Sequence, residues 1–196
     1  MGRAGFKDSE DTSIYTWTVD VESDWGGRTN EHRGITQGLP VIIDTFKQHS
    51  VTPIFFVSTE IISNYPNLIE ELRKVGEVGS HGHFHKRFEP WRAEKDKNIS
   101  LKYFDKEVPY RAPWFSHRTE DRYSQKEGHV SVLKYSWGFK GIPENPIFYI
   151  HPFDIVGEGK APSLFTKILY SRPQNVLDTF KRLVRLYPYS PKKTAS

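Results

Sequence analysis

Three histidines lie within five residues of one another in the segment Ser80-His81-Gly82-His83-Phe84-His85. Imidazole is a common ligand for Zn, Co, Ni and Fe, so this cluster indicates a metal site. In a helical loop, His81 and His85 would face the same side and could share one ion, whereas an extended segment would align all three rings. The cluster could also be a His-rich surface loop.

Two carboxylates, Asp20 and Glu22, stand at the end of the segment of residues 13–21, which is rich in β-branched and aromatic residues. In a strand, residues two apart point to the same face. Two carboxylates on one buried face repel each other and are costly to bury unless a cation compensates them. An acidic loop is the alternative interpretation. Asp24 is close in sequence, but residues 25–27 (Trp-Gly-Gly) predict that the chain has already turned away.

Two further segments carry groups suited to catalysis or binding. In the segment Arg111-Ala112-Pro113-Trp114, Arg111 could orient a carboxylate through two hydrogen bonds, and Trp114 could offer a stacking face or a backbone donor. A structural salt bridge and a core tryptophan would explain the same residues. His151 follows the apolar segment of residues 147–150, so it could be a strand-end functional residue or a core histidine.

The segments that must position these residues alternate between strand-like and helix-like patterns. The predicted strands cover residues 13–21, 52–58, 77–80, 108–111, 135–139 and 147–150. The predicted helices cover residues 36–49, 67–75 and 175–187, while residues 86–105 could be helix or loop. This alternation indicates parallel strands joined by crossover helices, an arrangement in which functional residues gather at the carboxyl ends of the strands.

The composition is that of a folded protein with one domain. Its 196 residues, 36% of them hydrophobic, suffice for one core, which we place at residues 13–188 between a flexible tail at 1–12 and a flexible basic tail at 189–196. The absence of cysteine leaves imidazole and carboxylate as the strong metal ligands. The net charge of +4 is spread along the chain, so we expect no nucleic-acid partner.

The hydropathy pattern predicts neither a transmembrane segment nor a signal peptide. No run of 18 apolar residues occurs, and residues 1–12 are polar and acidic where a signal peptide would be apolar. We therefore expect a cytoplasmic protein, and leave its oligomeric state open.

Taken together and in this order, the four segments resemble the motifs of the polysaccharide deacetylase family, which shares the NodB homology domain (carbohydrate esterase family 4). The resemblance spans residues 16–154. It implies an α/β fold, a distorted (β/α) barrel of about seven mostly parallel strands, similar to a TIM barrel. It also implies a hydrolase of non-peptide carbon–nitrogen bonds that removes an N-acyl group, first of all acetyl, from an amino sugar of a glycan.

The resemblance implies a role for each residue of the first two segments. Asp20 matches the catalytic base, and Glu22 matches the acidic metal ligand of the subgroup in which the two acids are one residue apart. His81 and His85 match the two histidine ligands, which are four apart in the family, and His83 does not. The implied cofactor is a divalent metal, Zn first, with Co, Ni or Fe as alternatives.

The last two segments complete the implied site. Arg111 matches the arginine that holds the catalytic aspartate, and Trp114 matches the position whose backbone N–H helps to bind the oxyanion. His151 matches the general acid, and Asp154 stands where the family often has glutamate. Three other functions remain open: deformylation of a lipid-linked amino sugar, opening of a cyclic amide, and metal-dependent sugar binding without turnover.

Overall fold

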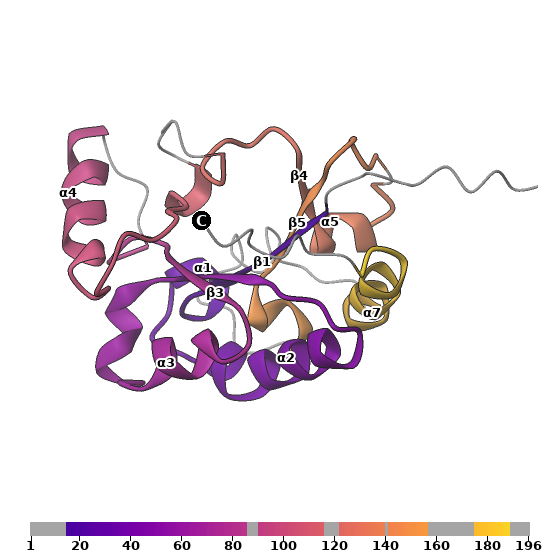
Figure 1. Cartoon of the computed structure of the whole chain (residues 1–196), viewed down its shortest axis with the longest axis horizontal. Helices are drawn as coiled ribbons and strands as arrows, with labels where there is room; N and C mark the ends of the chain where they lie inside the picture. Colours follow the sequence, from indigo (N-terminus) through magenta and orange to yellow (C-terminus); the bar gives the residue numbers. More distant parts are fainter. Residues whose placement is uncertain (1–14, 86–89, 116–121, 140, 157–174, 189–196) are drawn as a thin grey trace, which may run out of the picture.

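The computed structural model describes residues 15–85, 90–115, 122–139, 141–156 and 175–188. The tails predicted at 1–12 and 189–196 lie outside these residues. One sheet of five strands, in the order β3-β2-β1-β5-β4, forms the centre of the described part, and helices lie along it (Figure 1). None of the described helices has the length and apolar character needed to cross a membrane.

All strand pairs of the sheet are parallel. The strands are β1 (Thr16–Val21), β2 (Ile54–Val57), β3 (Glu77–Ser80), β4 (His129–Ser131) and β5 (Ile147–Ile150). The central strand β1 alternates polar and apolar residues, yet all six are buried. Its polar face therefore needs partners inside the protein: Thr18, for example, donates a hydrogen bond of 2.9 Å to the carbonyl oxygen of Phe148 in β5.

Short helices connect the strands and cover the sheet. They are α1 (Asp24–Gly27), the π-helical turn η1 (Gly34–Gly38), α2 (Leu39–Gln48), η2 (Thr59–Ser63), α3 (Leu68–Arg73), α4 (Pro90–Leu101), η3 (Pro113–Phe115), α5 (Val132–Ser136), η4 (Pro152–Ile155) and α7 (Val176–Leu186). Trp17 of β1 forms the centre of the main core, in contact with Phe46 of α2, Phe148 of β5 and Phe180 of α7. Burying each phenylalanine contributes about 1.5–3 kcal/mol.

The two edges of the sheet approach each other across the site. Beyond the β3 edge, Tyr110 pairs with Ser80 in a parallel bridge. The next residue, Arg111, lies 3.2 Å from the ring of His129, which begins β4 at the opposite edge. The sheet is thus curled in the manner of a distorted barrel, which agrees with the predicted α/β fold. About seven strands were predicted, and the described residues form five.

Most predicted elements correspond to observed ones, with ends shifted by a few residues, but the strand predicted at 108–111 is only the single bridge at Tyr110, and the strand predicted at 135–139 is wrong. That segment begins inside α5 and continues into a turn. Its aromatic residues favour a strand locally, but Ser131 caps a helix there by accepting a hydrogen bond from the amide of Lys134. The strand of this region is β4, three residues long and too short to stand out as a hydrophobic pattern.

Candidate active site

A cleft of about 680 Å³ opens where β1, β3 and β5 end. Six of the seven predicted site residues line it: Asp20, Glu22, His81, His85, Trp114 and His151. The seventh, Arg111, is fully buried behind Asp20. The structure therefore brings together residues from four segments that are far apart in sequence, as the strand-end argument predicted.

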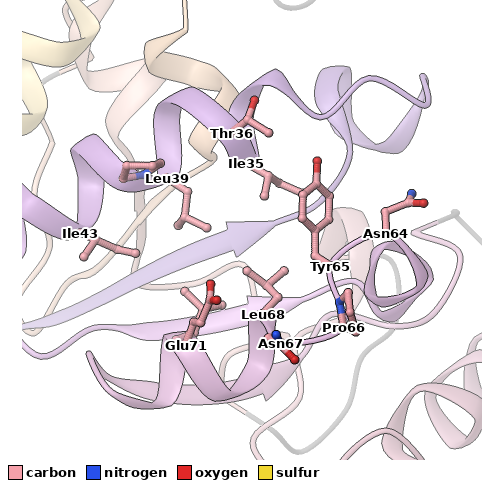
Figure 2. Close-up of a pocket in the computed structure, with 12 residues that line it drawn as sticks. Ile35, Thr36, Leu39, Ile43, Asn64, Tyr65, Pro66, Asn67, Leu68 and Glu71 are labelled. Atoms are coloured by element: carbon pink, nitrogen blue, oxygen red, sulfur yellow. The ribbon is translucent and has the colours of Figure 1, made fainter.

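A second cavity, of about 360 Å³, lies between α2 and α3 and contains none of these residues (Figure 2). Its walls are largely apolar and include Leu39, Ile43 and Leu68, with Glu71 at the edge. A cavity of this lining can receive an apolar group but offers no set of groups for acid–base or metal chemistry. The larger cleft is the candidate active site.

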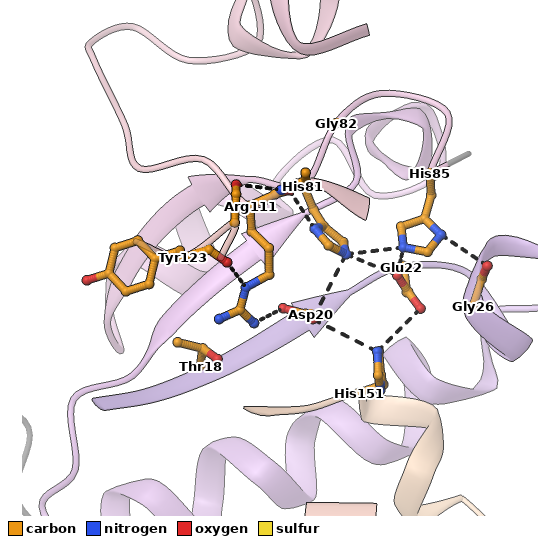
Figure 3. A network of polar contacts seen from close by, with 12 residues as sticks. Thr18, Asp20, Glu22, Gly26, His81, Gly82, His85, Arg111, Tyr123 and His151 are labelled. Carbon is orange, nitrogen blue, oxygen red and sulfur yellow. Dashed lines mark hydrogen bonds and ion pairs between the residues drawn. The ribbon is translucent and has the colours of Figure 1, made fainter. Parts of the chain in front are cut away.

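Glu22, His81 and His85 converge on one point of the cleft (Figure 3). One ligand atom from each lies within 4.8 Å of the other two, and all three residues are buried. The Nε2 atoms of the two histidines are 3.1 Å apart, Glu22 Oε2 is 3.4 Å from Nε2 of His81, and it is in direct contact with Nε2 of His85.

The donor chemistry of this triplet fits a divalent cation. The Nδ1 atoms of His81 and His85 lie 2.9 and 3.0 Å from the carbonyl oxygens of Arg111 and Gly26, so the Nδ1 protons are directed to the backbone. In the neutral rings, both Nε2 lone pairs then face Glu22, whose buried oxygens have no hydrogen-bond partner in the described part. Three convergent electron-pair donors with oriented imidazoles are a typical zinc ligand set.

The charge of the site also favours a bound cation. Of the three buried carboxylates here, Asp20 pairs with the buried guanidinium of Arg111 and Asp154 pairs with His151, whereas Glu22 faces the rings of His81 and His85. Burial by itself would lower the pKa of His85, but the neighbouring Glu22 carboxylate raises it overall. Glu22 therefore attracts positive charge, which favours a cation at the triplet.

The loop that carries the three histidines separates the rings of His81 and His85 from the ring of His83. The amides of His83 and Phe84 donate hydrogen bonds of 2.8 and 3.0 Å to the carboxylate of Asp96 in α4. The ring of His83 turns away from the cluster, with Nδ1 2.9 Å from the hydroxyl of Thr59. The loop is therefore bent rather than extended, with φ of 78° at Gly82 and 45° at His85, and His81 and His85 are the two histidines that come together.

Asp20 is held in place by Arg111. Nη1 of Arg111 donates a hydrogen bond of 2.6 Å to Oδ1 of Asp20, while Oδ2 faces His81 and His151 at 4.0 and 3.9 Å. Burial alone would raise the pKa of Asp20, but the Arg111 guanidinium and the two histidines lower it overall. Asp20 is therefore an ionised carboxylate with one oxygen anchored and the other facing the cleft.

His151 lies on the opposite side of the cleft from His85 and is held by Asp154. Oδ2 of Asp154 accepts hydrogen bonds from the backbone amide and Nδ1 of His151 at 2.9 and 3.0 Å. Burial alone would lower the pKa of His151, but Asp154, with Glu22 and Asp20, raises it to about 9. The Nε2 atom that faces Asp20 and Glu22 can therefore carry a proton near neutral pH.

Trp114 forms part of the cleft wall beside the metal-ligand triplet. Its indole lies 5.9 Å from the ring of His85, and the guanidinium of Arg28 lies 5.0 Å above it. Trp114 is 38% exposed, with φ of 59° in the middle of the proline-containing turn η3. Trp114 thus contributes its side chain to the lining of the cleft.

Sequence reasoning missed one supporting residue, His129, gave Asp154 no role, and placed Asp24 outside the site. Asp154 had a signal, because an acid three residues after His151 fits a capping pattern. His129 had none, since a lone histidine at the start of a three-residue strand is uninformative. Asp24 accepts amide hydrogen bonds from Arg33 and Gly34, so it supports η1 and does not join the metal-ligand triplet.

Comparisons with known proteins agree with this geometry. The sequence model of the family described as polysaccharide deacetylase matches residues 24–119, a stretch that contains His81, His85, Arg111 and Trp114. None of the curated proteins matches the chain.

Three solved structures resemble the fold over most of its length. The peptidoglycan deacetylase PdaC from Bacillus subtilis is 15% identical with a TM-score of 0.54, over 90% of this chain and 85% of that chain. A family 4 carbohydrate esterase from Streptomyces lividans, solved with acetate, is 10% identical with a TM-score of 0.54, over 90% and 88%. The Bc1960 peptidoglycan N-acetylglucosamine deacetylase is 14% identical with a TM-score of 0.52, over 90% and 85%.

Proposed function

Because the chain belongs to the polysaccharide deacetylase family, we propose that it is a metal-dependent hydrolase that removes an N-acyl group, acetyl in the first instance, from an amino sugar of a glycan. The observation that carries the proposal is the meeting of three units in one cleft. They are the Glu22–His81–His85 triplet, the Asp20–Arg111 pair and the His151–Asp154 pair. A sugar-binding protein would have no need for the latter two pairs.

The triplet would hold the cation, zinc first among the candidates. When bound, such an ion supplies Lewis acidity, which polarises an acyl carbonyl and makes a water molecule a better nucleophile near neutral pH. Asp20 is placed to take the proton from that water as it attacks the carbonyl carbon. Arg111 keeps Asp20 ionised and oriented for this step, which is the condition for a general base.

His151 is placed to complete the hydrolysis. With Asp154 supporting its protonated form, it gives a proton from Nε2 to the departing sugar nitrogen, so the amine leaves neutral and the acyl group leaves as a carboxylate. The backbone N–H of Trp114 is our candidate donor to the developing oxyanion. A well-placed donor of this kind contributes about 3–4 kcal/mol to the transition state.

A substrate panel tests the reaction. We expect metal-loaded protein to release acetate from N-acetylated chitooligosaccharides, measured by an enzyme-coupled acetate assay. Glycan binding without acetate would overturn the proposal in favour of a sugar-binding protein. Activity on a formylated amino sugar or a cyclic amide alone would keep the hydrolase and overturn the acetyl specificity.

Substitution of Asp20 tests the base. Asp20→Asn keeps an oxygen that can accept from Arg111 but cannot take a proton, so we expect kcat to fall at least ~100-fold with metal content unchanged. Thermal unfolding of the variant serves as the folding control. Full activity in Asp20→Asn would exclude Asp20 as the base.

The histidine loop offers a matched pair of variants for the metal. His81→Ala should abolish binding of a stoichiometric divalent metal, whereas His83→Ala, two residues along the same loop, should retain it. Elemental analysis of the purified proteins gives both the stoichiometry and the identity of the ion. Equal metal content in the two variants would contradict the ligand assignment.

A further inference from the structure

The guanidinium of Arg111 is enclosed, and each of its three nitrogens meets a polar atom. Nη1 donates to Asp20, Nε donates to the carbonyl oxygen of Tyr123 at 3.2 Å, and Nη2 lies 3.2 Å from Nε2 of His129. The side chain of Arg111 is 0% exposed, and its guanidinium carbon lies 4.5 Å from the ring centre of Phe56. Its orientation is therefore set entirely by these neighbours.

The contact with Arg111 fixes the state of the His129 ring. A guanidinium can only donate, so Nε2 of His129 must accept, and the ring proton must be on Nδ1. Nδ1 lies 3.2 Å from the carbonyl oxygen of Glu127, which can receive that proton. Burial and the nearby Arg111 lower the pKa of His129 to about 4, in agreement with a neutral ring at physiological pH.

The ring of His129 is also held on its flanks. Phe115 and Tyr149 contact it edge to face, with ring centres 4.9 and 6.2 Å away. His129 begins β4, and Arg111 follows the bridge at the other edge of the sheet, so this hydrogen bond joins the two edges of the curled sheet. Nε2 of His129 therefore faces Arg111 at a fixed place beside the cleft.

A neutral acceptor at this position has an electrostatic consequence. Among the described residues, Asp20 is the one carboxylate that pairs with Arg111, and the other two acceptors, Tyr123 O and His129 Nε2, carry no net charge. All the positive charge of the guanidinium therefore remains available to Asp20. A carboxylate in place of His129 would compete for it.

We propose that His129 is a positioning residue of the active site: its neutral imidazole accepts from Nη2 of Arg111 and so fixes the guanidinium in the orientation that holds Asp20 towards the cleft. The role rests on the proposed function, since it matters for catalysis only if Asp20 is the base. No substrate contact by His129 is required.

Two substitutions separate positioning from a merely structural role. In His129→Gln, the side-chain oxygen can occupy the place of Nε2 and still accept from Arg111, whereas the shorter side chain in His129→Asn reaches only the place of Nδ1. We expect His129→Gln to keep kcat within ~3-fold of wild type. His129→Asn should lower kcat ~10- to 100-fold with KM and metal content unchanged, because the base is then misplaced.

Equal losses in the two variants, or a loss expressed in KM, would overturn the proposal. A readout without turnover is the tautomer of His129 in the wild-type protein. Long-range ¹H–¹⁵N spectra at pH 7, assigned by comparison with His129→Gln, should show a neutral ring with its proton on Nδ1. An Nε2–H ring or a charged ring would overturn the proposal. If the wild type hydrolyses no amide, the proposed function fails, while the tautomer still tests the contact with Arg111.

Discussion

At the scale of single residues, Arg111 joins two parts of the site. Its carbonyl oxygen accepts the Nδ1 proton of His81 and turns Nε2 of that ring towards Glu22, while its guanidinium anchors Asp20. One residue thus orients both a ligand of the metal triplet and the proposed base. The fully buried arginine is tolerated because its charge is paired with Asp20 and its backbone carbonyl accepts a hydrogen bond from His81.

Asp154 gives the sharpest prediction at this scale. Asp154→Asn can still accept the hydrogen bonds from His151 but no longer stabilises the imidazolium, so the pKa of His151 should fall from about 9. The general acid is active when protonated, and activity is lost as the pH rises through its pKa. The alkaline limb of the kcat profile should therefore move to lower pH in Asp154→Asn.

In numbers, we expect kcat of Asp154→Asn to be reduced ~10-fold or more at pH 8 and much less at pH 6. Steady-state rates across this range, with metal content measured at each pH, would check it. An equal reduction at both pH values would mean that Asp154 does not act through the protonation of His151.

At the scale of elements, the local hydrophobic pattern predicted which functional residues lie at strand ends. It could not predict contacts that depend on the tertiary arrangement of the sheet. Asp20 and His151 stand at the ends of strand-like segments, and His81 follows the short segment of residues 77–80, which the alternation of elements predicts as a strand, so their meeting in one cleft could be predicted. The contact between Arg111 and His129 could not, because it depends on how far the sheet curls. Curling is set by packing across the whole sheet, which no local window contains.

The π-helical turn η1 packs against η4, the turn that follows the proposed general acid His151. This packing can be tested at Gly38. A Cβ on Gly38 would collide with the carbonyl oxygen of Pro152, and one on Gly34 would lie 2.6 Å from the amide nitrogen of Phe153. Both contacts are with η4, which directly follows His151. The absence of side chains at these two glycines is what lets η4 pack closely.

We expect Gly38→Ala to destabilise the protein by ~1–3 kcal/mol through overpacking, although alanine is the better helix former. Since η4 must move, kcat should fall ~10-fold or more, while affinity for the metal is kept because its ligands lie on other elements. Gln37→Ala, an exposed neighbour in the same turn, is the matched control for chemical denaturation and kinetics. A Gly38→Ala protein as stable as that control would contradict the close packing.

At the scale of the whole molecule, the site draws on one edge of the sheet and on two of its inner strands. The central strand β1 supplies Asp20 and leads to Glu22; the β3 edge leads to His81 and Arg111; the inner strand β5 leads to His151. The apolar face of β1 packs on α2 and α7, so the core and the site share one strand. Stability and metal binding should therefore be coupled.

This coupling predicts a large effect of metal removal on thermal unfolding. The folded protein gathers Glu22, His81 and His85, whereas the unfolded chain separates them, so zinc should bind the folded state preferentially. At a free zinc concentration 100 times Kd, the gain is ~2.7 kcal/mol. For a chain of this size we expect a rise in Tm of ~5–10 °C, reversed by a chelator.

The same coupling predicts which variants are stabilised by zinc and how pH changes the zinc-induced shift in Tm. His83→Ala should show the full shift in Tm and His81→Ala almost none, since only the second loses a ligand. Because Glu22 raises the pKa of His85, the ion must displace a proton there, and the shift should be larger at pH 8 than at pH 6. Differential scanning fluorimetry with buffered zinc measures both effects. A shift of equal size in His81→Ala would place the stabilising ion elsewhere and separate the metal from the cleft that holds Asp20 and His151.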